Sequence, residues 1–251
     1  GITPKKAWNV SKSRERLRSL DNLSDLILEF NHRPFQTKFI FYDKSLVWSM
    51  SNPVNRHLVD GKNLALTVSR QLAAPPWNHV FCSNTIVELC YITNRTKEGN
   101  HVFPLYIFED RSNELFSKTD IKPIPNISPV FLSTMRKYIE HGGTLRAKRN
   151  DYDEPEAVFY YCYAILHSAS YRNRYENFLT SDFPRIPLPK NTKLTQGLIE
   201  LGSELKSLHL LKTDNPTKNI ISLVGIGDFR LEKIFYSDGT VWIDEKKTRG
   251  F

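Results

Sequence analysis

The sequence predicts an α+β fold in which a twisted, mainly antiparallel or mixed sheet forms the first half and a helical layer packs on it from the second half. Short runs rich in β-branched and aromatic residues, separated by turn residues, occupy positions 31–108. Longer runs in which apolar residues recur at helical spacing occupy positions 128–212. The 251 residues are 40% hydrophobic and 12% aromatic, so the chain can bury a substantial core.

The first predicted element is a helix over residues 11–30. Apolar side chains recur there at intervals of three and four residues, with charged residues between them: Leu17, Leu20, Leu23, Ile27 and Phe30. We therefore assign residues 1–30 to a helical connector and residues 31–251 to the main domain. Gly1 stands at the start and Phe251 at the end without a capping or turn signal, so we expect both termini to be cuts in a longer protein.

The next region is predicted to be rich in strands that belong to one sheet. Its β-like runs are TKFIFYD, SLVW, NLALTVSR, HVFCSN, IVELCYIT and VFPLYIF. One short helix interrupts them in NPVNRHLVDGKN, with Asn52 as N-cap, Pro53 at the first helical position and Gly61 as its end. The polar, proline-punctuated stretch 109–127 predicts a long loop before the helical region begins.

The helical region contains four predicted helices. SPVFLSTMRKYIEHGG begins at the N-cap Ser128 and ends at a glycine pair, and EPEAVFYYCYAILHS is apolar on all sides, which is typical of a central helix. In the third, Arg172 is placed to pair with Glu176, and four side chains share an inward face: Tyr171, Tyr175, Phe178 and Leu179. The fourth carries a leucine seam that predicts packing against another helix: Leu194, Leu198, Leu201, Leu205 and Leu208.

The C-terminal region predicts a β-hairpin over residues 231–243. Asp238 and Gly239 supply the positive φ angles that a tight turn needs. The neighbouring triplet of Asp238, Glu245 and Lys247 also fits the acid followed by acid-x-lysine pattern of metal-dependent nucleases. A nuclease domain is therefore one alternative function.

The composition narrows the class of protein. A formal net charge of +8 favours polyanionic partners such as nucleic acid. Three cysteines without CxxC spacing predict neither a disulfide framework nor a zinc ribbon, which fits a reducing cytoplasm. The seven histidines lack metal-ligand spacing, and neither a signal peptide nor an apolar run of membrane-spanning length occurs.

The motif APPWN at 74–78 resembles the loop with which some methyltransferases hold a flipped base. It lacks the side-chain acceptor of that loop, because alanine stands at its first position, so we interpret it as a turn.

The candidate functional site of this chain consists of basic residues, since the catalytic motifs that its sequence resembles are incomplete or have the spacing expected by chance. Some surround a glycine pair that would let a loop swing toward a ligand, and others are spread over the sheet and its short helix, where they could share one face. Two more lie within the stretch SASYRNRYENFLTSDFPRIPLPK: Arg174 on the flank opposite its aromatic stripe, and Arg185 in its proline-rich exit. The candidate DNA-binding residues are Arg33, Lys38, Arg56, His57, Arg70, Arg136, Lys137, Arg146, Lys148, Arg149, Arg174 and Arg185.

The order of motifs along the chain resembles a known family. HRPFQTKFIFYDKSLVW, NLALTVSRQ, HVFCSNTIVE, FPLYIF, FYYCYAILHSASYRNRYENFLTSDFPRIPLP and LGSELKSLHLL together resemble the C-terminal specificity region of Type ISP restriction-modification enzymes and related N6-adenine DNA methyltransferases. The resemblance runs from about residue 8 to 243, and the string from Tyr160 to Pro189 is its most specific part.

The resemblance implies a target recognition domain. Such a domain would dock on double-stranded DNA, read base edges in the major groove and present the target adenine to a neighbouring methyltransferase domain. It would hold no catalytic residue and no cofactor; the parent would use S-adenosylmethionine, with ATP and Mg²⁺ where translocase and nuclease domains are present. Residues 1–30 would lead from the methyltransferase side, and base reading is expected from the excursions 109–127 and 142–152. The second alternative, besides the nuclease domain, is an interaction domain whose leucine seam binds another subunit.

Overall fold

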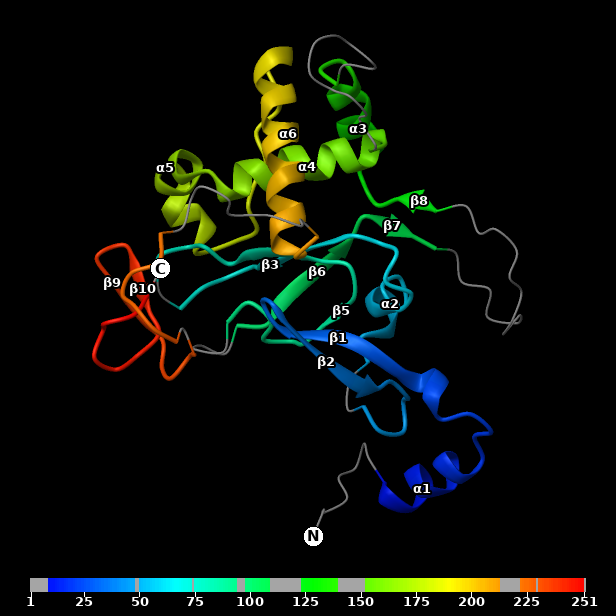
Figure 1. Cartoon of the computed structure of the whole chain (residues 1–251). Coiled ribbons are helices and arrows are strands. Elements are labelled where there is room, and N and C mark those ends of the chain that lie inside the picture. The colour runs from blue at the N-terminus through cyan, green and yellow to red at the C-terminus, as the bar shows by residue number, and fades with distance from the viewer. Residues whose placement is uncertain are drawn as a thin grey trace. The chain divides into compact units, whose positions relative to one another are not determined.

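A computed structural model gives the fold (Figure 1), and it describes residues 9–47, 50–73, 75–93, 98–108, 123–139, 152–212, 222–228 and 230–250. The chain divides into two compact units, Gly1–Leu211 and Lys212–Phe251. The larger unit holds strands mostly in its first half and three successive helices in its second half, which confirms the predicted α+β class. Nowhere in the described ranges is a helix both long enough and apolar enough to cross a bilayer.

The N-terminal helix is shorter than its leucine spacing predicts. Helix α1, Val10–Arg18, begins at Asn9, whose side chain accepts hydrogen bonds from the N–H groups of Ser11 and Lys12. A 3₁₀ turn at Ser24–Leu26 (η1) leads into strand β1, Ile27–Arg33, so the predicted helix over 11–30 is wrong in its second half. The apolar residues of β1 alternate along the strand and contact a small core. Strand β2, Gln36–Phe41, provides hydrogen-bond partners for the β1 backbone, and the spacing of apolar residues within β1 does not indicate that such a partner exists.

The strands form several small sheets rather than the single predicted sheet. Strands β2, β1 and β5 (Ile86–Val87) form one mixed sheet, in which β1 pairs antiparallel with β2 and parallel with β5. The chain reaches β5 through a tight turn in which the Ser83 hydroxyl accepts from the N–H of Thr85 and donates to its carbonyl. That turn separates β5 from the strand before it, which belongs to the second sheet.

The second sheet is antiparallel, with β3 (Ala65–Ser69) between β4 (Val80–Ser83) and β6 (Asn100–Pro104). A two-stranded ribbon follows, β7 (Tyr106–Ile107) with β8 (Ile124–Pro125). The predicted strand SLVW is wrong over its described part, because residues 44–46 form a turn in which the Asp43 side chain accepts from the N–H of Ser45.

A short helix occurs among the strands as predicted, but it begins one residue early and ends at Asn55 instead of continuing to Gly61. Helix α2 spans Asn52–Asn55 and its N-cap is Ser51, not the predicted Asn52. Pro53 occupies the first turn as expected, and Gly61 closes the following turns with a φ of +69°.

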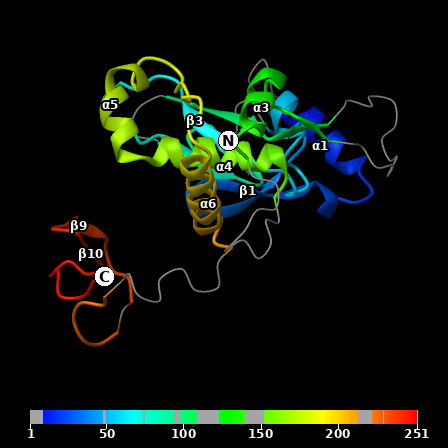
Figure 2. The same cartoon turned by 90° about the horizontal axis from the view of Figure 1, so that it is seen from above.

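The helical layer is built around one buried helix. Helix α4, Glu154–His167, begins in a capping box of Asp153 and Glu156, and it packs against α3 (Pro129–Arg136), α5 (Ala169–Leu179) and α6 (Thr192–His209). Figures 1 and 2 show α6 crossing α4. The same core includes Val68 and Val80 of the second sheet, so α4 is the central helix that its apolar sequence predicts.

The leucine seam of α6 is only partly used for packing. Leu194, Leu201 and Leu208 are exposed, whereas Thr195, Ile199 and Gly202 are buried. A Cβ at position 202 would lie 2.0 Å from the carbonyl oxygen of Tyr160, so α6 turns its glycine, not its leucine stripe, toward α4. Close backbone approach sets this orientation. The predicted seam is therefore confirmed for Leu198 and Leu205, which are partly buried against the core, and wrong for the three exposed leucines.

Helix α5 also departs from the prediction in two side chains. Tyr171 and Leu179 are buried as expected, but Phe178 is 72% exposed beyond the non-helical backbone of Tyr175. Arg172 does not hold Glu176: its Nε donates to the carbonyl of Leu166 at 2.6 Å and its Nη2 contacts His167 Nδ1 at 3.1 Å. The arginine thus caps the end of α4, where carbonyls lack helical partners.

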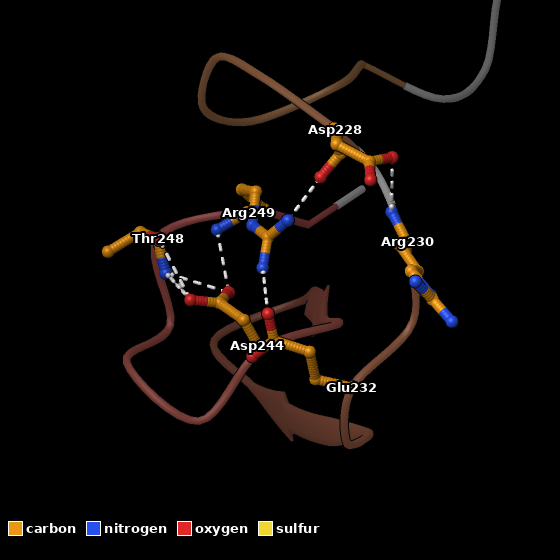
Figure 3. A network of polar contacts seen from close by, with 6 residues as sticks. All are labelled: Asp228, Arg230, Glu232, Asp244, Thr248 and Arg249. Carbon is orange, nitrogen blue, oxygen red and sulfur yellow. Dashed lines mark hydrogen bonds and ion pairs between the residues drawn. The ribbon is translucent and has the colours of Figure 1, made fainter.

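The smaller unit contains the predicted hairpin. Strand β9, Phe235–Ser237, pairs antiparallel with β10, Thr240–Trp242, and the two turn residues Asp238 and Gly239 have φ of 52° and 76°. The loop that follows is organised by the buried carboxylate of Asp244 (Figure 3), which accepts from the backbone N–H groups of Thr248 and Arg249 and from the Thr248 hydroxyl.

Candidate nucleic-acid interface

The predicted basic residues fall into separate groups on the larger unit. The first group lies on the β1–β2 hairpin, where Lys38 is exposed on the edge strand. Arg33 donates from Nη1 to Glu88 Oε2 at 2.6 Å and to the carbonyl of His32 at 2.5 Å. An arginine already held by a carboxylate has fewer donors left for a phosphate, so Lys38 is the more available cation of this pair.

The second group follows α2 and is largely internal. His57 is 4% exposed, its Nδ1 accepts from the N–H of Phe108 at 3.1 Å, and its carbonyl accepts from the Asn63 side chain at 2.9 Å. This histidine stabilises the fold and does not reach the surface on which a DNA backbone could lie. Arg56 beside it is partly buried at the C-cap of α2.

The third group lies at the end of α3. Arg136 forms a two-armed contact with Glu154, with Nε and Nη2 at 2.9 and 2.7 Å from its carboxylate oxygens, and Lys137 is exposed next to it. The Glu154 contact raises the pKa of the Arg136 guanidinium and fixes its plane against the first turn of α4. Arg146, Lys148 and Arg149 lie outside the described residues, as do most of the two excursions expected to read bases.

The fourth group brings together residues that are distant in the sequence. We call it the α5-exit surface and define it by Arg70, Arg174, Asp182, Phe183 and Arg185. Arg70 Nε donates to Asp182 Oδ1 at 3.0 Å, and its guanidinium carbon lies 5.6 Å from the centre of the Phe183 ring. The guanidinium carbon of Arg174 lies 5.7 Å from the ring of Tyr175. Two of the cations are therefore placed against aromatic faces, an arrangement that restricts their orientation.

Asp182 is the acidic centre of the α5-exit surface. Its pKa is lowered by the backbone N–H of Phe183, by the Arg70 side chain and by the charge of Arg185. The carboxylate is therefore ionised at neutral pH and lies within the electrostatic reach of both arginines. Two guanidiniums, those of Arg70 and Arg185, act on this one carboxylate, and Arg174 adds a third cation over the neighbouring Tyr175 ring, so the α5-exit surface carries an excess of positive charge.

Local sequence explains how this surface is assembled. The hydroxyl of Tyr171 donates to the carbonyl of Arg185 at 2.8 Å, and that of Tyr161 donates to the carbonyl of Pro187 at 3.0 Å. Prolines restrict the same segment to extended backbone, so the side chain of Arg185 is left exposed. The N–H of Leu72 donates to the carbonyl of Thr180 at 3.0 Å, which fixes the segment after β3 beside the end of α5.

The sequence named all three cations of the α5-exit surface but missed what joins them. Asp182 and Phe183 lie in the string SDFPRIP, and nothing in that string marks them as partners of Arg70. The proposed common face of Arg33, Lys38, Arg56, His57 and Arg70 is not formed by one sheet, because Arg33 and Arg70 adjoin strands of different sheets.

The three residues of the nuclease alternative, Asp238, Glu245 and Lys247, each have a different local environment. Glu245 forms an ion pair with Lys233 at 3.0 Å, Lys247 Nζ contacts the Ser237 hydroxyl at 3.4 Å, and Asp238 lies in the hairpin turn. No group of three or more His, Cys, Asp or Glu side chains that could hold a metal ion occurs in the part of the chain that the structure describes.

Comparison with known proteins identifies the family. No curated protein matches the sequence significantly. Among solved structures, similarity extends to the ATP-dependent Type ISP restriction-modification enzyme LlaBIII bound to DNA, with 18% identity over 99% of this chain and a TM-score of 0.63. A nuclease-deletion mutant of the Type ISP enzyme LlaGI with a DNA substrate mimic gives 22% identity over 92% and a TM-score of 0.58.

The DrdV–DNA complex is also similar, with 21% identity over 88% of this chain and a TM-score of 0.58. The chain spans 15%, 18% and 20% of the lengths of LlaBIII, LlaGI and DrdV respectively. A family match described as Type ISP C-terminal specificity domain covers residues 3–250. The chain therefore belongs to the Type ISP C-terminal specificity domain family.

Proposed function

We propose that this chain is a sequence-specific recognition module for double-stranded DNA, and that it works beside a methyltransferase domain to which it presents the target adenine. The observation that carries the proposal is the α5-exit surface, where Arg70 and Arg185 act on the Asp182 carboxylate and Arg174 lies over the neighbouring Tyr175 ring. Membership of the specificity family and the DNA bound in the similar structures support it.

In this proposal phosphate contacts and base contacts are divided between two kinds of surface. Arg70, Arg174 and Arg185 would bind the DNA backbone and fix the register of the domain. Base edges in the major groove would be read from the excursions 109–127 and 142–152, where Arg146, Lys148 or Arg149 could donate to guanine. The neighbouring domain would transfer the methyl group from S-adenosylmethionine, and this chain would contribute no catalytic residue.

The phosphate role of the α5-exit surface is tested by salt dependence. Each of Arg174→Gln and Arg185→Gln should weaken binding to specific and non-specific duplexes alike and should reduce the slope of log affinity against log salt by about one. Arg18→Gln is the matched control, since Arg18 is an exposed arginine at the end of α1. Equal slopes for the wild type and all three variants would remove the α5-exit surface from the interface.

Base reading is tested in the second excursion. Arg146→Ala or Arg149→Ala should weaken specific binding by about 1–3 kcal/mol if the side chain reads guanine, or should flatten the salt slope by about one unit if it contacts phosphate. A result with neither change would exclude that loop from the interface.

The recognised motif itself can be obtained in cells. Mapping N6-methyladenine in the host genome with and without the parent gene should show one methylated sequence that disappears with the gene. Incubating the isolated chain with plasmid and Mg²⁺ separates recognition from the nuclease alternative, because recognition predicts binding without cleavage. Failure to bind any duplex, at low or high salt, would favour the interaction-domain alternative.

A further inference from the structure

A hollow of about 320 Å³ lies beside the α5-exit surface, between α5 and the extended segment that follows it. Four aromatic side chains contribute to its lining, and the polar groups at its edge come from the same short stretch of chain. The residues that matter for its chemistry are Tyr171, Tyr175, Phe178, Asp182, Phe183 and Arg185. The volume is at the small end of the range for ligand pockets, which suits a single planar group.

The aromatic rings of the hollow are only partly used by the core. Phe178 is 72% exposed although it belongs to a helix whose neighbours Tyr171 and Leu179 are buried. The rings of Tyr171 and Tyr175 lie 5.1 Å apart, and the Tyr171 hydroxyl is already bonded to the carbonyl of Arg185. An exposed ring beside two ordered rings leaves an aromatic face available for stacking.

The charge at the edge of the hollow selects the class of ligand. Arg185 and Asp182 line the hollow, Asp182 is held by Arg70, and Arg174 lies over the lining ring of Tyr175, so three guanidiniums lie on the lining or next to it. Aromatic rings flanked by guanidiniums are the combination with which proteins bind single-stranded nucleic acid, because the bases stack and the phosphates are neutralised. A stacked duplex offers only base edges in its grooves and cannot place a base face on these rings.

We propose that the hollow binds one unstacked nucleotide of single-stranded DNA, with its base against Phe178 and Tyr175 and its flanking phosphates at Arg174 and Arg185. This activity goes beyond recognition of a duplex sequence. It adds a site for a strand that has left the double helix, on the same surface to which the duplex backbone is assigned.

The test measures binding of a labelled single-stranded oligothymidylate to the full 251-residue chain by fluorescence anisotropy. A second oligonucleotide of equal length and charge carries one abasic position among the thymidines, so that stacking is reduced while the phosphates remain. We expect the wild type to bind the intact strand and Phe178→Ala to weaken this binding about fivefold or more, while Phe178→Tyr retains it.

Matched controls separate this site from general loss of structure and from the proposed function. Leu201→Ala removes another exposed apolar side chain, on α6, and should leave single-strand binding unchanged. Phe178→Ala should leave duplex binding unchanged. If duplex binding fails while the single strand still depends on Phe178, duplex recognition is wrong and the nucleotide site stands.

Three outcomes would overturn the nucleotide site. The wild type could fail to bind the single strand, Phe178→Ala could bind it as tightly as the wild type, or polyglutamate could displace it as effectively as unlabelled oligothymidylate does. The last result would show that charge alone, and not a nucleobase, determines binding to this surface.

Discussion

The two units of the chain are stabilised in different ways. In Gly1–Leu211 the helix α4 is buried on nearly all sides, and apolar side chains from three other helices and the second sheet pack around it. In Lys212–Phe251 the described core contains little more than Ile243, and a polar network replaces it. Asp244 holds Thr248 and the N–H of Arg249, while the Arg249 guanidinium bonds to Glu232 and to the carbonyl of Asp228 (Figure 3).

Each unit should therefore be sensitive to a different kind of substitution. Apolar packing tolerates the loss of single exposed side chains but not a change of volume or backbone spacing at its centre. A small unit buries too little apolar surface to be stable by packing alone, so it depends on satisfied polar groups and on correct turn geometry. Substitutions in the larger unit should therefore act through packing, and those in the smaller unit through hydrogen bonds.

The largest effect is expected from Gly202→Ala. The added Cβ would meet the Tyr160 carbonyl oxygen at 2.0 Å, so α6 could not keep its place on α4. We expect the free energy of unfolding of the larger unit to fall by about 4 kcal/mol or more, measured by urea denaturation. Gly197→Ala is the control in the same helix, since nothing lies within 4 Å of its Cβ and alanine favours a helix by up to about 1 kcal/mol. Equal stability of the two variants would contradict this packing of α6.

The next effect is expected from a cavity in the same core. Leu166→Ala should cost about 3 kcal/mol, because Leu166 is fully buried on α4 and its removal leaves a void. Leu201→Ala on α6, where the leucine is 61% exposed, should change the free energy of unfolding by no more than about 0.5 kcal/mol. A large loss from Leu201→Ala would mean that the leucine seam is buried after all.

The two units should also respond differently to acid. Burial, with the charges of Arg172 and His209, lowers the pKa of His167 to about 3 from its ordinary 6.5. The unfolded larger unit therefore binds a proton before the folded unit does, so its stability should fall as pH drops below about 6.5. Burial alone would raise the pKa of Asp244, but hydrogen bonds from Arg249 and Thr248 lower it overall. Its contribution should be lost only as pH falls below about 4.

Hydrogen exchange of α4 and of the β9–β10 hairpin, followed from pH 7 to pH 3, would report the two units separately. His167→Gln should flatten the response of the larger unit between about pH 6.5 and pH 4, because glutamine can accept from Arg172 without titrating. Asp244→Asn should make the smaller unit less stable at pH 7 and should remove its response below about pH 4. If both units of the wild type lost protection over the same pH range, the proposed difference between them would be wrong.

The smallest effect is expected at the hairpin turn. Gly239→Ala should cost the smaller unit about 1 kcal/mol, because its φ of 76° is strained for a residue with a Cβ although nothing obstructs that atom. Gly239→Asn should lose less, since asparagine tolerates the left-handed region, and Lys246→Ala on the exposed loop should lose nothing measurable. The melting temperatures of the three variants would rank their stabilities. A Gly239→Ala variant as stable as the wild type would exclude this turn type.

Local signals in the sequence were sufficient for several elements. The Ser128–Pro129 start of α3, the apolar sequence of α4 and the Asp238–Gly239 hairpin turn are confirmed where predicted. Each of these depends on interactions between neighbours in the chain: a cap, a periodicity, a positive φ. The same kind of reasoning failed for β1, whose leucine and phenylalanine spacing fits a helix until β2 is available as a partner.

The α+β class and the central helix can be predicted from the sequence alone, as can the basic residues available for a nucleic-acid surface. The tertiary structure decided which of those residues meet: it placed Arg70 beside Asp182 and Phe183, buried His57, and turned Gly202 rather than the leucine seam toward α4. The physical reason is that capping, periodicity and turn geometry act over a few residues. Ion pairs, ring contacts and close backbone approach depend on distances in space, which the whole fold sets at once.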